Sequence, residues 1–213
     1  MNRVRQAVVW ALLILAQTAH AQTLDALLKA VAEDNLPDAV FYLDRGMEAD
    51  TTDARGTTLL MIASRLGYTD MASMLLERRA SVTRQTPAGD TALLMASLGG
   101  HLEVVKLLVK AGAPVQTPSG WQPIHYAAFR GANDVVGFLL DRGADKEARA
   151  PNNLFTPLML AVREGHGDTA KLLIDRGADV SKRGYSGETA LSIAQGHEDS
   201  GMIALLKRAG AAE

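Results

Sequence analysis

The feature that most constrains this chain is a repeat of about 33 residues that runs through nearly all of it. An alanine with the same spacing of apolar residues around it recurs six times, at intervals of 33, 33, 31, 34 and 33 residues. Leucine or tyrosine stands twelve residues after most of these marks, and glycine stands sixteen residues after five of them. The marker alanines are Ala30, Ala63, Ala96, Ala127, Ala161 and Ala194. The pattern predicts a stack of similar units, each contacting its neighbours.

The most regular unit, residues 89–112, predicts a pair of short helices. Thr91 is suited to cap the first helix, because its hydroxyl can accept a hydrogen bond from an amide of the first turn. Two glycines end that helix, and apolar residues then return at helical spacing from Leu102 until Gly112 supplies a left-handed turn. Each helix has only about three turns, which is too short for stability alone in water. The apolar faces must therefore pack against neighbouring units.

Two units open their first helix on sequences close to T-P-L-H-x-A. These are Thr156-Pro157-Leu158-Met159-Leu160-Ala161 and Gln122-Pro123-Ile124-His125-Tyr126-Ala127. With a 33-residue period, this motif resembles the ankyrin repeat. The resemblance covers residues 24–211 and implies an all-α ankyrin-repeat solenoid of six helix-turn-helix units, both caps included, with short β-turn fingers. The units are expected at about 24–50, 53–82, 86–115, 117–146, 150–180 and 184–211.

Four units depart from this pattern in their loops or turns. Unit four is two residues shorter in its entry loop, which carries Pro118, Trp121 and Pro123 and is predicted to be tight. Arg79 replaces the glycine that ends the second unit, so we expect a less regular turn there. In unit five, Leu154 replaces the usual glycine and the finger is one residue longer, which predicts a different bend. In unit six, Glu198 stands where glycine normally divides the helices, and the polar residues around it suit a carboxy-terminal cap.

Residues 1–21 do not follow the repeat and are predicted to be a signal peptide. Arg3 and Arg5 give a positive start, an apolar run of about ten residues follows, and residues 19–21 (Ala-His-Ala) fit a cleavage signal before Gln22. The run is well short of the roughly 20 residues that span a bilayer, so a retained anchor is the weaker alternative. We therefore expect a periplasmic or secreted protein, with no membrane insertion after cleavage.

Composition and motifs give no indication of catalysis, metal binding or nucleic-acid binding. Removal of residues 1–21 leaves 20 basic and 24 acidic residues, without the basic patch of a nucleic-acid-binding protein. His101 and His166 open second helices, the resemblance implies that His125 makes structural hydrogen bonds, and no metal-ligand motif is present. The aspartates of recurring Asp-Arg-Gly turns, Asp44, Asp141 and Asp175, are interpreted as solvated charges. No cofactor is expected, and a metal-dependent or catalytic protein is a remote alternative.

Aromatic and arginine residues of units four to six form the candidate binding surface. The resemblance implies that the entry loops project as fingers and, with the first helices, line a concave groove. The residues that map to this groove and have the composition of an interface hot spot are Trp121, Phe129, Arg130, Phe155, Arg163 and Tyr185. The alternative is that Trp121 and Phe155 fold down over the irregular loops of their own units. The matching positions of units two and three are small or mixed and are predicted to provide few anchors.

The favoured functional hypothesis is a non-catalytic scaffold in the bacterial envelope that recognises a protein partner through the concave groove. A sharper variant is an inhibitor or immunity protein that blocks a periplasmic toxin or hydrolase. The protein is expected to be a monomer. The sequence does not identify the partner.

Overall fold

The structure is a computed structural model that describes residues 23–117 and 120–212. These residues form six helix pairs, as the predicted all-α solenoid requires. The first helix spans 23–32, and the others are α2 (Leu36–Asp44), α3 (Leu59–Leu66), α4 (Thr69–Glu77), α5 (Ala92–Gly99), α6 (Leu102–Lys110), α7 (Pro123–Arg130), α8 (Asn133–Asp141), α9 (Pro157–Arg163), α10 (Gly167–Asp175), α11 (Ala190–Gly196) and α12 (Ser200–Arg208). None of the helices in this part of the chain has the length and apolar character of a membrane span. The predicted signal peptide, residues 1–21, lies outside the described residues.

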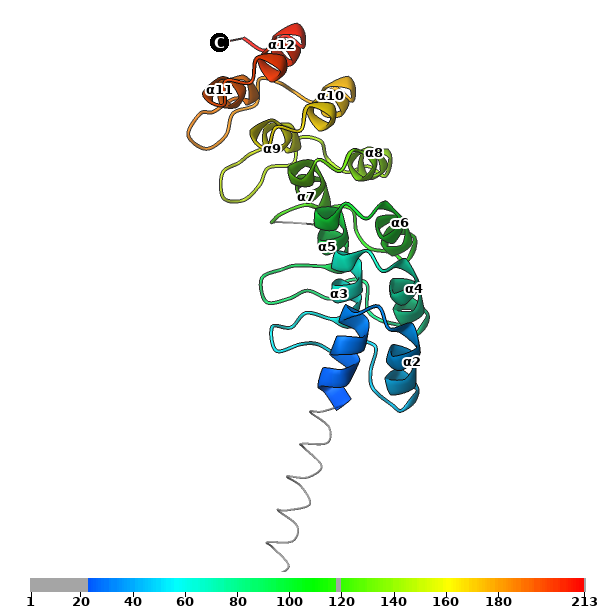
Figure 1. The fold of residues 1–213 in the computed structure, drawn as a ribbon. Helices are drawn as coiled ribbons and strands as arrows, with labels where there is room; N and C mark the ends of the chain where they lie inside the picture. The colour runs from blue at the N-terminus through cyan, green and yellow to red at the C-terminus, as the bar shows by residue number, and fades with distance from the viewer. Residues whose placement is uncertain (1–22, 118–119, 213) are drawn as a thin grey trace, which may run out of the picture.

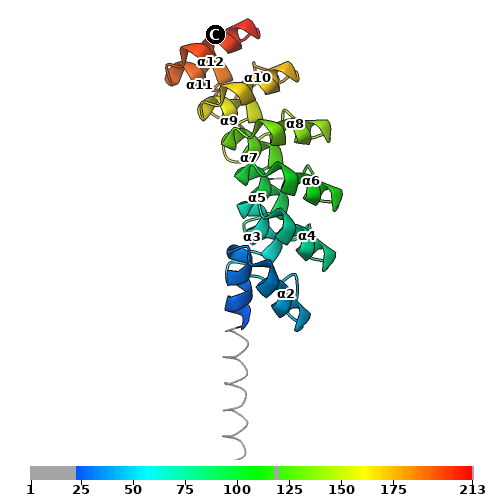
Figure 2. The ribbon, with the colours of Figure 1, turned by 45° about the vertical axis from the view of Figure 1, so that its right-hand side comes forward.

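The helix pairs stack into an elongated solenoid of two layers (Figure 1). The first helices α3, α5, α7, α9 and α11 form one layer, and the second helices α4, α6, α8, α10 and α12 form the other. The fingers project from the side of the first helices, and Figure 2 shows the same succession of units from a second direction. We call the surface made by the fingers and the first helices the finger surface. It corresponds to the groove predicted from the sequence.

The core lies between the two layers and continues from unit to unit. The six marker alanines are at most 5% exposed, and their small side chains allow neighbouring first helices to approach closely. Each of the last five second helices also buries a leucine fully: Leu75, Leu108, Leu139, Leu173 and Leu206. Burial of one such side chain is worth roughly 1.5–3 kcal/mol. Stability is therefore distributed along the stack, as expected for a solenoid.

Threonine hydroxyls begin most of the first helices. Each accepts a hydrogen bond from the amide three residues later, at 3.1 to 3.3 Å, and the residues concerned are Thr58, Thr91, Thr156 and Thr189. In unit four the cap position is Gln122, and Pro123 follows at the first helical position, where no amide partner is needed. Gly67, Gly100 and Gly131 end three of these helices in the left-handed conformation.

The expectation of a less regular turn at Arg79 is wrong. Arg79 takes the left-handed conformation itself, with a φ of 64°. Its amide donates to the carbonyl of Leu76 at 2.9 Å, and the amide of Ala80 donates to that of Leu75 at 3.0 Å. Gly112 and the residue after it make the same two bonds in unit three. The packing of the unit holds Arg79 in a backbone conformation that costs about 1–2 kcal/mol for a residue other than glycine.

Side chains at the start of the second helices connect neighbouring units. His101 Nε2 donates to the carbonyl of Arg65 at 3.0 Å, and His166 Nε2 donates to the carbonyl of Phe129 at 2.9 Å. Tyr68 makes the equivalent bond to the carbonyl of Ala32 at 3.4 Å. In each case the acceptor is a carbonyl near the end of the first helix of the preceding unit. These histidines have structural roles.

The aspartates of the Asp-Arg-Gly turns are exposed, as predicted, and two of them also join adjacent units. Asp44 pairs with Arg78 at 2.9 Å, and Asp141 pairs with Arg176 at 2.7 Å. Exposed pairs of this kind contribute about 0–1 kcal/mol each. Their role is to support the alignment of units rather than chemistry in a shared cleft.

Candidate functional site

The fingers of units two, three and six are closed by the same two backbone hydrogen bonds. In unit two the amide of Asp53 donates to the carbonyl of Thr57, and the amide of Gly56 donates to the carbonyl of Asp53, both at 3.0 Å. Burial raises the pKa of Asp53, but hydrogen bonds from the amides of Thr57 and Arg55 outweigh this effect and leave the pKa below its usual value. The carboxylate is thus an internal part of the finger.

The finger of unit five has one extra residue, as predicted, and closes differently. The amide of Ala150 donates to the carbonyl of Phe155 at 2.9 Å, and the amide of Leu154 donates back to the carbonyl of Ala150 at 2.9 Å. Leu154 occupies the left-handed conformation, with a φ of 58°, in place of the usual glycine. The wider turn directs the side chain of Phe155 into the protein.

Phe155 is only 7% exposed, so the prediction that it lies open on the binding surface is wrong. Its ring lies against Gly184 at the base of the next finger, where a β-carbon would stand 2.7 Å from the ring edge. The guanidinium of Arg163 lies 5.5 Å from the ring centroid on another side, and it also pairs with Glu164 at 2.8 Å. Phe155 is therefore buried, as in the alternative prediction, but its ring packs against Gly184 of the next finger.

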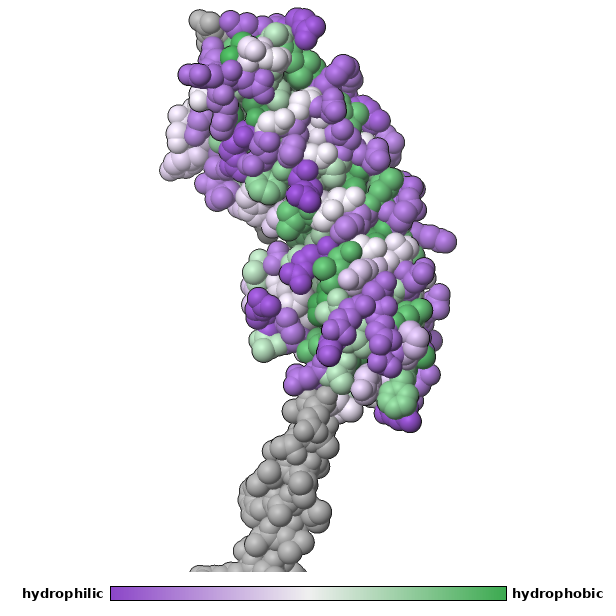
Figure 3. All heavy atoms as spheres, in the orientation of Figure 1, coloured by the Kyte–Doolittle hydropathy of each residue, from purple (hydrophilic) through white to green (hydrophobic). Residues whose placement is uncertain are grey.

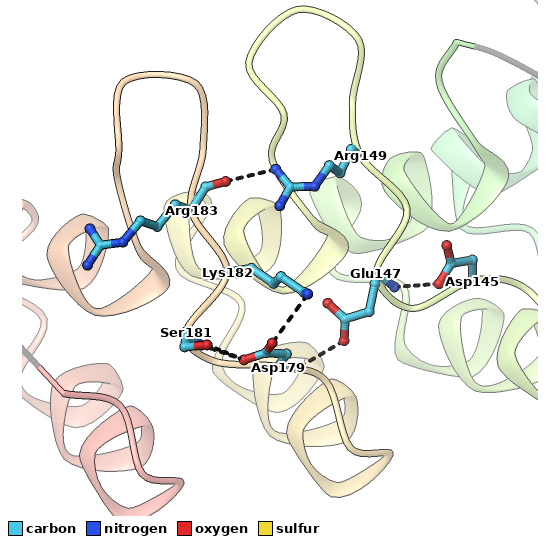
Figure 4. Close-up of polar contacts among 7 residues, drawn as sticks. All are labelled: Asp145, Glu147, Arg149, Asp179, Ser181, Lys182 and Arg183. Carbon is cyan, nitrogen blue, oxygen red and sulfur yellow. Dashed lines mark hydrogen bonds and ion pairs between the residues drawn. The ribbon is translucent and has the colours of Figure 1, made fainter.

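The fingers of units five and six are joined to each other. The amide of Tyr185 donates to the carbonyl of Asn153 at 2.8 Å. Nearer the base, Arg149 Nη1 donates to the carbonyl of Arg183 at 2.9 Å, as Figure 4 shows. We call the pair formed by residues 150–155 and 184–188 the closed fingers. One backbone hydrogen bond thus already joins the facing edges of the two fingers.

A polar cluster below the closed fingers holds the two units together (Figure 4). Glu147 Oε1 accepts from the amide of Asp179 at 2.8 Å. The Asp179 carboxylate in turn accepts from the hydroxyl of Ser181 at 2.6 Å and lies 3.4 Å from the ammonium of Lys182. The hydrogen bonds from Ser181 lower the pKa of Asp179. This cluster stabilises the loops and is not a catalytic pair.

Trp121 packs mainly against its own unit. Its ring meets His125 edge to face, with centroids 5.5 Å apart, and lies 5.4 Å from the ring of Tyr126. His125 is fully buried: its Nδ1 accepts from the amide of Gln122 at 3.0 Å, and its Nε2 donates to the carbonyl of Ala148 at 2.9 Å. Burial lowers the pKa of His125. The predicted structural role of His125 is confirmed.

The remaining predicted anchors are exposed but do not form one patch with the others. Phe129 is 38% exposed and Tyr185 is 80% exposed. Arg130 is also exposed. Within the described residues, no ring contact or ion pair joins these three side chains to each other or to Trp121. Figure 3 likewise shows hydrophilic and hydrophobic side chains interspersed over the viewed face.

The finger surface of units one to three has a groove of about 620 Å³, in the part of the predicted groove where few anchors were expected. Its apolar part comes from Leu28, Ala32, Ile62 and Met95. Its polar and small lining residues are Lys29, Asp53, Arg55, Thr57, Arg65, Thr86, Pro87, Ala88 and Asp90. We call this the amino-terminal groove. Its volume lies within the usual range of ligand sites, roughly 300–1,000 Å³.

The finger surface offers side chains that can contact a ligand. The described residues contain no cluster of side chains that could bind a metal ion. In residues 23–117 and 120–212, no group of three or more histidine, aspartate or glutamate side chains could hold a metal ion. The amino-terminal groove combines an apolar floor with cationic side chains at its edge. That composition suits the binding of another molecule by contact.

Comparison with known proteins identifies the repeats. A family model described as "Ankyrin repeats (3 copies)" matches residues 27–117 and 79–150, and one described as "Ankyrin repeat" matches 153–185. The chain is 39% identical over 87 residues to protein phosphatase 1 regulatory subunit 27 of Homo sapiens, covering 38% of this chain and 56% of that protein. It is 32% identical over 121 residues to a putative ankyrin repeat-containing protein of Treponema pallidum (strain Nichols), covering 55% and 41%.

A solved structure shows the same fold. The crystal structure of the human ASB11 ankyrin repeat domain superposes with a TM-score of 0.82 at 28% sequence identity, covering 87% of this chain and 84% of that one. The likeness extends along almost the whole stack, whereas the match to the human phosphatase subunit spans little more than half of that protein.

Proposed function

We propose that this chain, which belongs to the ankyrin-repeat family, is a non-catalytic scaffold. It binds a protein partner through its finger surface in the bacterial envelope. Ankyrin repeats generally mediate interaction between proteins. The observation that carries the proposal for this chain is the amino-terminal groove, which joins two fingers and three first helices into one accessible depression. A groove of this kind presents several units at once to an extended ligand.

The envelope location is part of the proposal and rests on the sequence of residues 1–21. Their positive start, short apolar run and Ala-His-Ala ending support export through a cleaved signal peptide. The measurement is the amino terminus of the protein recovered from cells, together with its distribution between cytoplasmic and envelope fractions. A mature chain that begins at Gln22 in the envelope fraction supports the location. An intact amino terminus in the cytoplasm contradicts it.

Regulation of an enzyme is the second candidate function. The human relative is named as a regulatory subunit of a protein phosphatase, which supports a role in which binding alters the activity of an enzyme partner. An inhibitor or immunity protein acting on an envelope hydrolase or toxin belongs to this class. Such a role is tested by the activity of the captured partner, which changes when this chain is added.

The experiment that tests the scaffold function is affinity capture from the envelope fraction with variants of residues on the finger surface. Arg65→Ala and Met95→Ala alter the amino-terminal groove, while Phe129→Ala alters the finger surface outside it. Phe41→Ala is the matched control, because Phe41 is a 46% exposed aromatic on α2, a second helix. Loss of the partner with finger-surface variants alone supports the proposal. Equal loss with Phe41→Ala, or no specific partner with any form, contradicts it.

A further inference from the structure

The acidic residues of the amino-terminal groove are already bonded within their own fingers. Asp53 Oδ1 accepts from the amides of Arg55 and Thr57, both at 2.8 Å. In the next finger, Asp90 Oδ2 accepts from the hydroxyl of Thr86 at 3.3 Å, and the amide of Asp90 donates to the same hydroxyl at 3.1 Å. These bonds engage one oxygen of each carboxylate and help to shape the two fingers.

The cations of the groove are much less engaged. Within the described residues, the side chain of Arg65 makes no hydrogen bond or ion pair, although its carbonyl accepts from His101. The side chain of Arg55 is 88% exposed, and its nearest approach to Asp53 is 3.8 Å. Lys29 lies 3.9 Å from Glu33, and both are well exposed. Pairs this long and exposed are weak, so Arg55 and Lys29 can exchange them for a ligand carboxylate, and Arg65 can bind one without giving up a pair.

The floor between these cations is apolar. Ile62 and Met95 lie one repeat apart on α3 and α5, and Leu28 lies on the helix at 23–32. All three line the amino-terminal groove together with Pro87 at the edge of a finger. An apolar ligand group laid here removes this surface from water, which favours binding by about 25 cal/mol per Å² covered. The groove therefore offers two kinds of recognition at once.

We propose that the amino-terminal groove binds an extended protein segment in which carboxylates flank an apolar side chain. The carboxylates pair with Arg55, Arg65 and Lys29, and the apolar side chain lies on Ile62 and Met95. A nucleic acid fits less well, because none of the lining residues is aromatic and the groove lacks the rings on which successive bases stack. This inference rests on the proposed scaffold function and specifies the chemistry of the partner segment.

The test uses three labelled peptides that differ in one feature each. The first carries a central leucine flanked by glutamates in a serine-glycine background, the second has glutamine in place of glutamate, and the third has serine in place of leucine. Binding to the purified protein is measured by fluorescence anisotropy. We expect the first peptide to bind about tenfold more tightly than either analogue. The difference in affinity between this peptide and the glutamine peptide is expected to become smaller when salt is raised from about 50 mM to about 500 mM, because exposed charges are screened.

Variants assign the effect to the groove. Arg65→Glu is expected to weaken binding of the glutamate peptide about tenfold and to leave binding of the glutamine peptide nearly unchanged. Lys110→Glu is the matched control, since Lys110 is an exposed cation at the end of α6, outside the groove. Circular dichroism is used to check that both variants fold. The peptide comparison on the unaltered protein gives a result even where a variant does not fold.

Several results overturn the inference. Equal affinity for the glutamate and glutamine peptides removes the role of charge, and equal weakening by Lys110→Glu removes the role of the groove. Equally tight binding to single-stranded DNA, or to vesicles of phosphatidylglycerol and phosphatidylcholine, shows a general preference for anions. Failure to bind any peptide also overturns it. The scaffold function is judged separately, because capture of a partner through the finger surface can succeed where the peptides fail.

Discussion

The two ends of the finger surface are built from the same repeat but differ in what their fingers contact. In units two and three, the two fingers line the amino-terminal groove and approach each other where Pro87 lies beside Gly56, and the side chains of Arg55 and Arg65 are exposed. In units five and six, the closed fingers are joined through Tyr185 and Asn153, and the aromatic side chain of Phe155 is buried between them. The regular units therefore leave a surface open for a partner, while the irregular units use their unusual residues to stabilise the stack.

The largest expected effect comes from Phe155→Ala, which tests whether the closed fingers are part of the core. Removal of a buried phenylalanine side chain is expected to lower the free energy of unfolding by about 3–5 kcal/mol. Phe129→Ala is the control, because Phe129 is 38% exposed and its removal is expected to cost less than about 1 kcal/mol. Urea denaturation measures both values. Equal, small losses would mean that Phe155 is free to act as an anchor.

Gly184→Ala tests the contact between the closed fingers from the other side. The added β-carbon would lie 2.7 Å from both the ring of Phe155 and the carboxylate of Glu188. We expect a loss of about 1–3 kcal/mol, typical of overpacking. Gly167→Ala has open space around it and is expected to be neutral or slightly stabilising. Thermal unfolding of the two variants is compared, and a neutral result at Gly184 would contradict the contact.

His125 lies in unit four, between the two regions. Its protonation is expected to destabilise the fold in acid. Burial lowers its pKa in the folded state below the ordinary value of 6.5, so below pH 6.5 the unfolded chain binds a proton that the folded protein does not. Stability is fully present above pH 6.5 and falls as the pH drops towards the folded pKa, by at most about 1.4 kcal/mol per pH unit.

The measurement is the free energy of unfolding between pH 7.5 and pH 5.5, both within about one unit of the ordinary histidine pKa. His125→Gln is expected to be less stable than the unaltered protein at neutral pH but to lose less on acidification. His101→Gln, at a partly exposed histidine, is the comparison. A His125→Gln variant with the same pH dependence as the unaltered protein would show that His125 does not carry the effect.

The smallest expected effect is a gain. Arg79→Gly removes the strain of a left-handed arginine in unit two, and we expect stabilisation by up to about 1 kcal/mol, partly offset by the greater freedom of glycine in the unfolded chain. The reverse change in unit three, Gly112→Arg, is expected to lower the free energy of unfolding by a similar amount. Denaturation midpoints measure both. Destabilisation by Arg79→Gly would mean that the arginine side chain contributes a contact that outweighs the strain.

Helix positions followed from the sequence because each is tied to a repeated local signal. A threonine precedes most first helices, a left-handed glycine ends several elements, and the marker alanine fixes the spacing. The irregular turns were harder to predict. Arg79 made a regular turn because the packing of its unit imposes the conformation whatever the residue.

The candidate site was predicted less well, because exposure depends on where a loop directs its side chains. Phe155 has the residue type of an anchor, but the extra residue of its finger directs it inward. The small residue Gly184 in the next finger was the one signal that a bulky neighbour needed space. The groove of units two and three was expected to provide few anchors, because its predicted lining positions are small or mixed. The contribution of the buried Ile62 and the half-buried Met95 to its floor depends on how two fingers pack, which the sequence does not specify.

The central claim is that a partner lies on the amino-terminal groove and not on the closed fingers. Hydrogen–deuterium exchange of the protein, alone and with its captured partner, tests this most directly. We expect slower exchange on binding in residues 53–66 and 86–95, with residues 150–155 and 184–188 unchanged. Slower exchange concentrated in 120–130 and 150–188, with residues 53–66 unchanged, would contradict the claim.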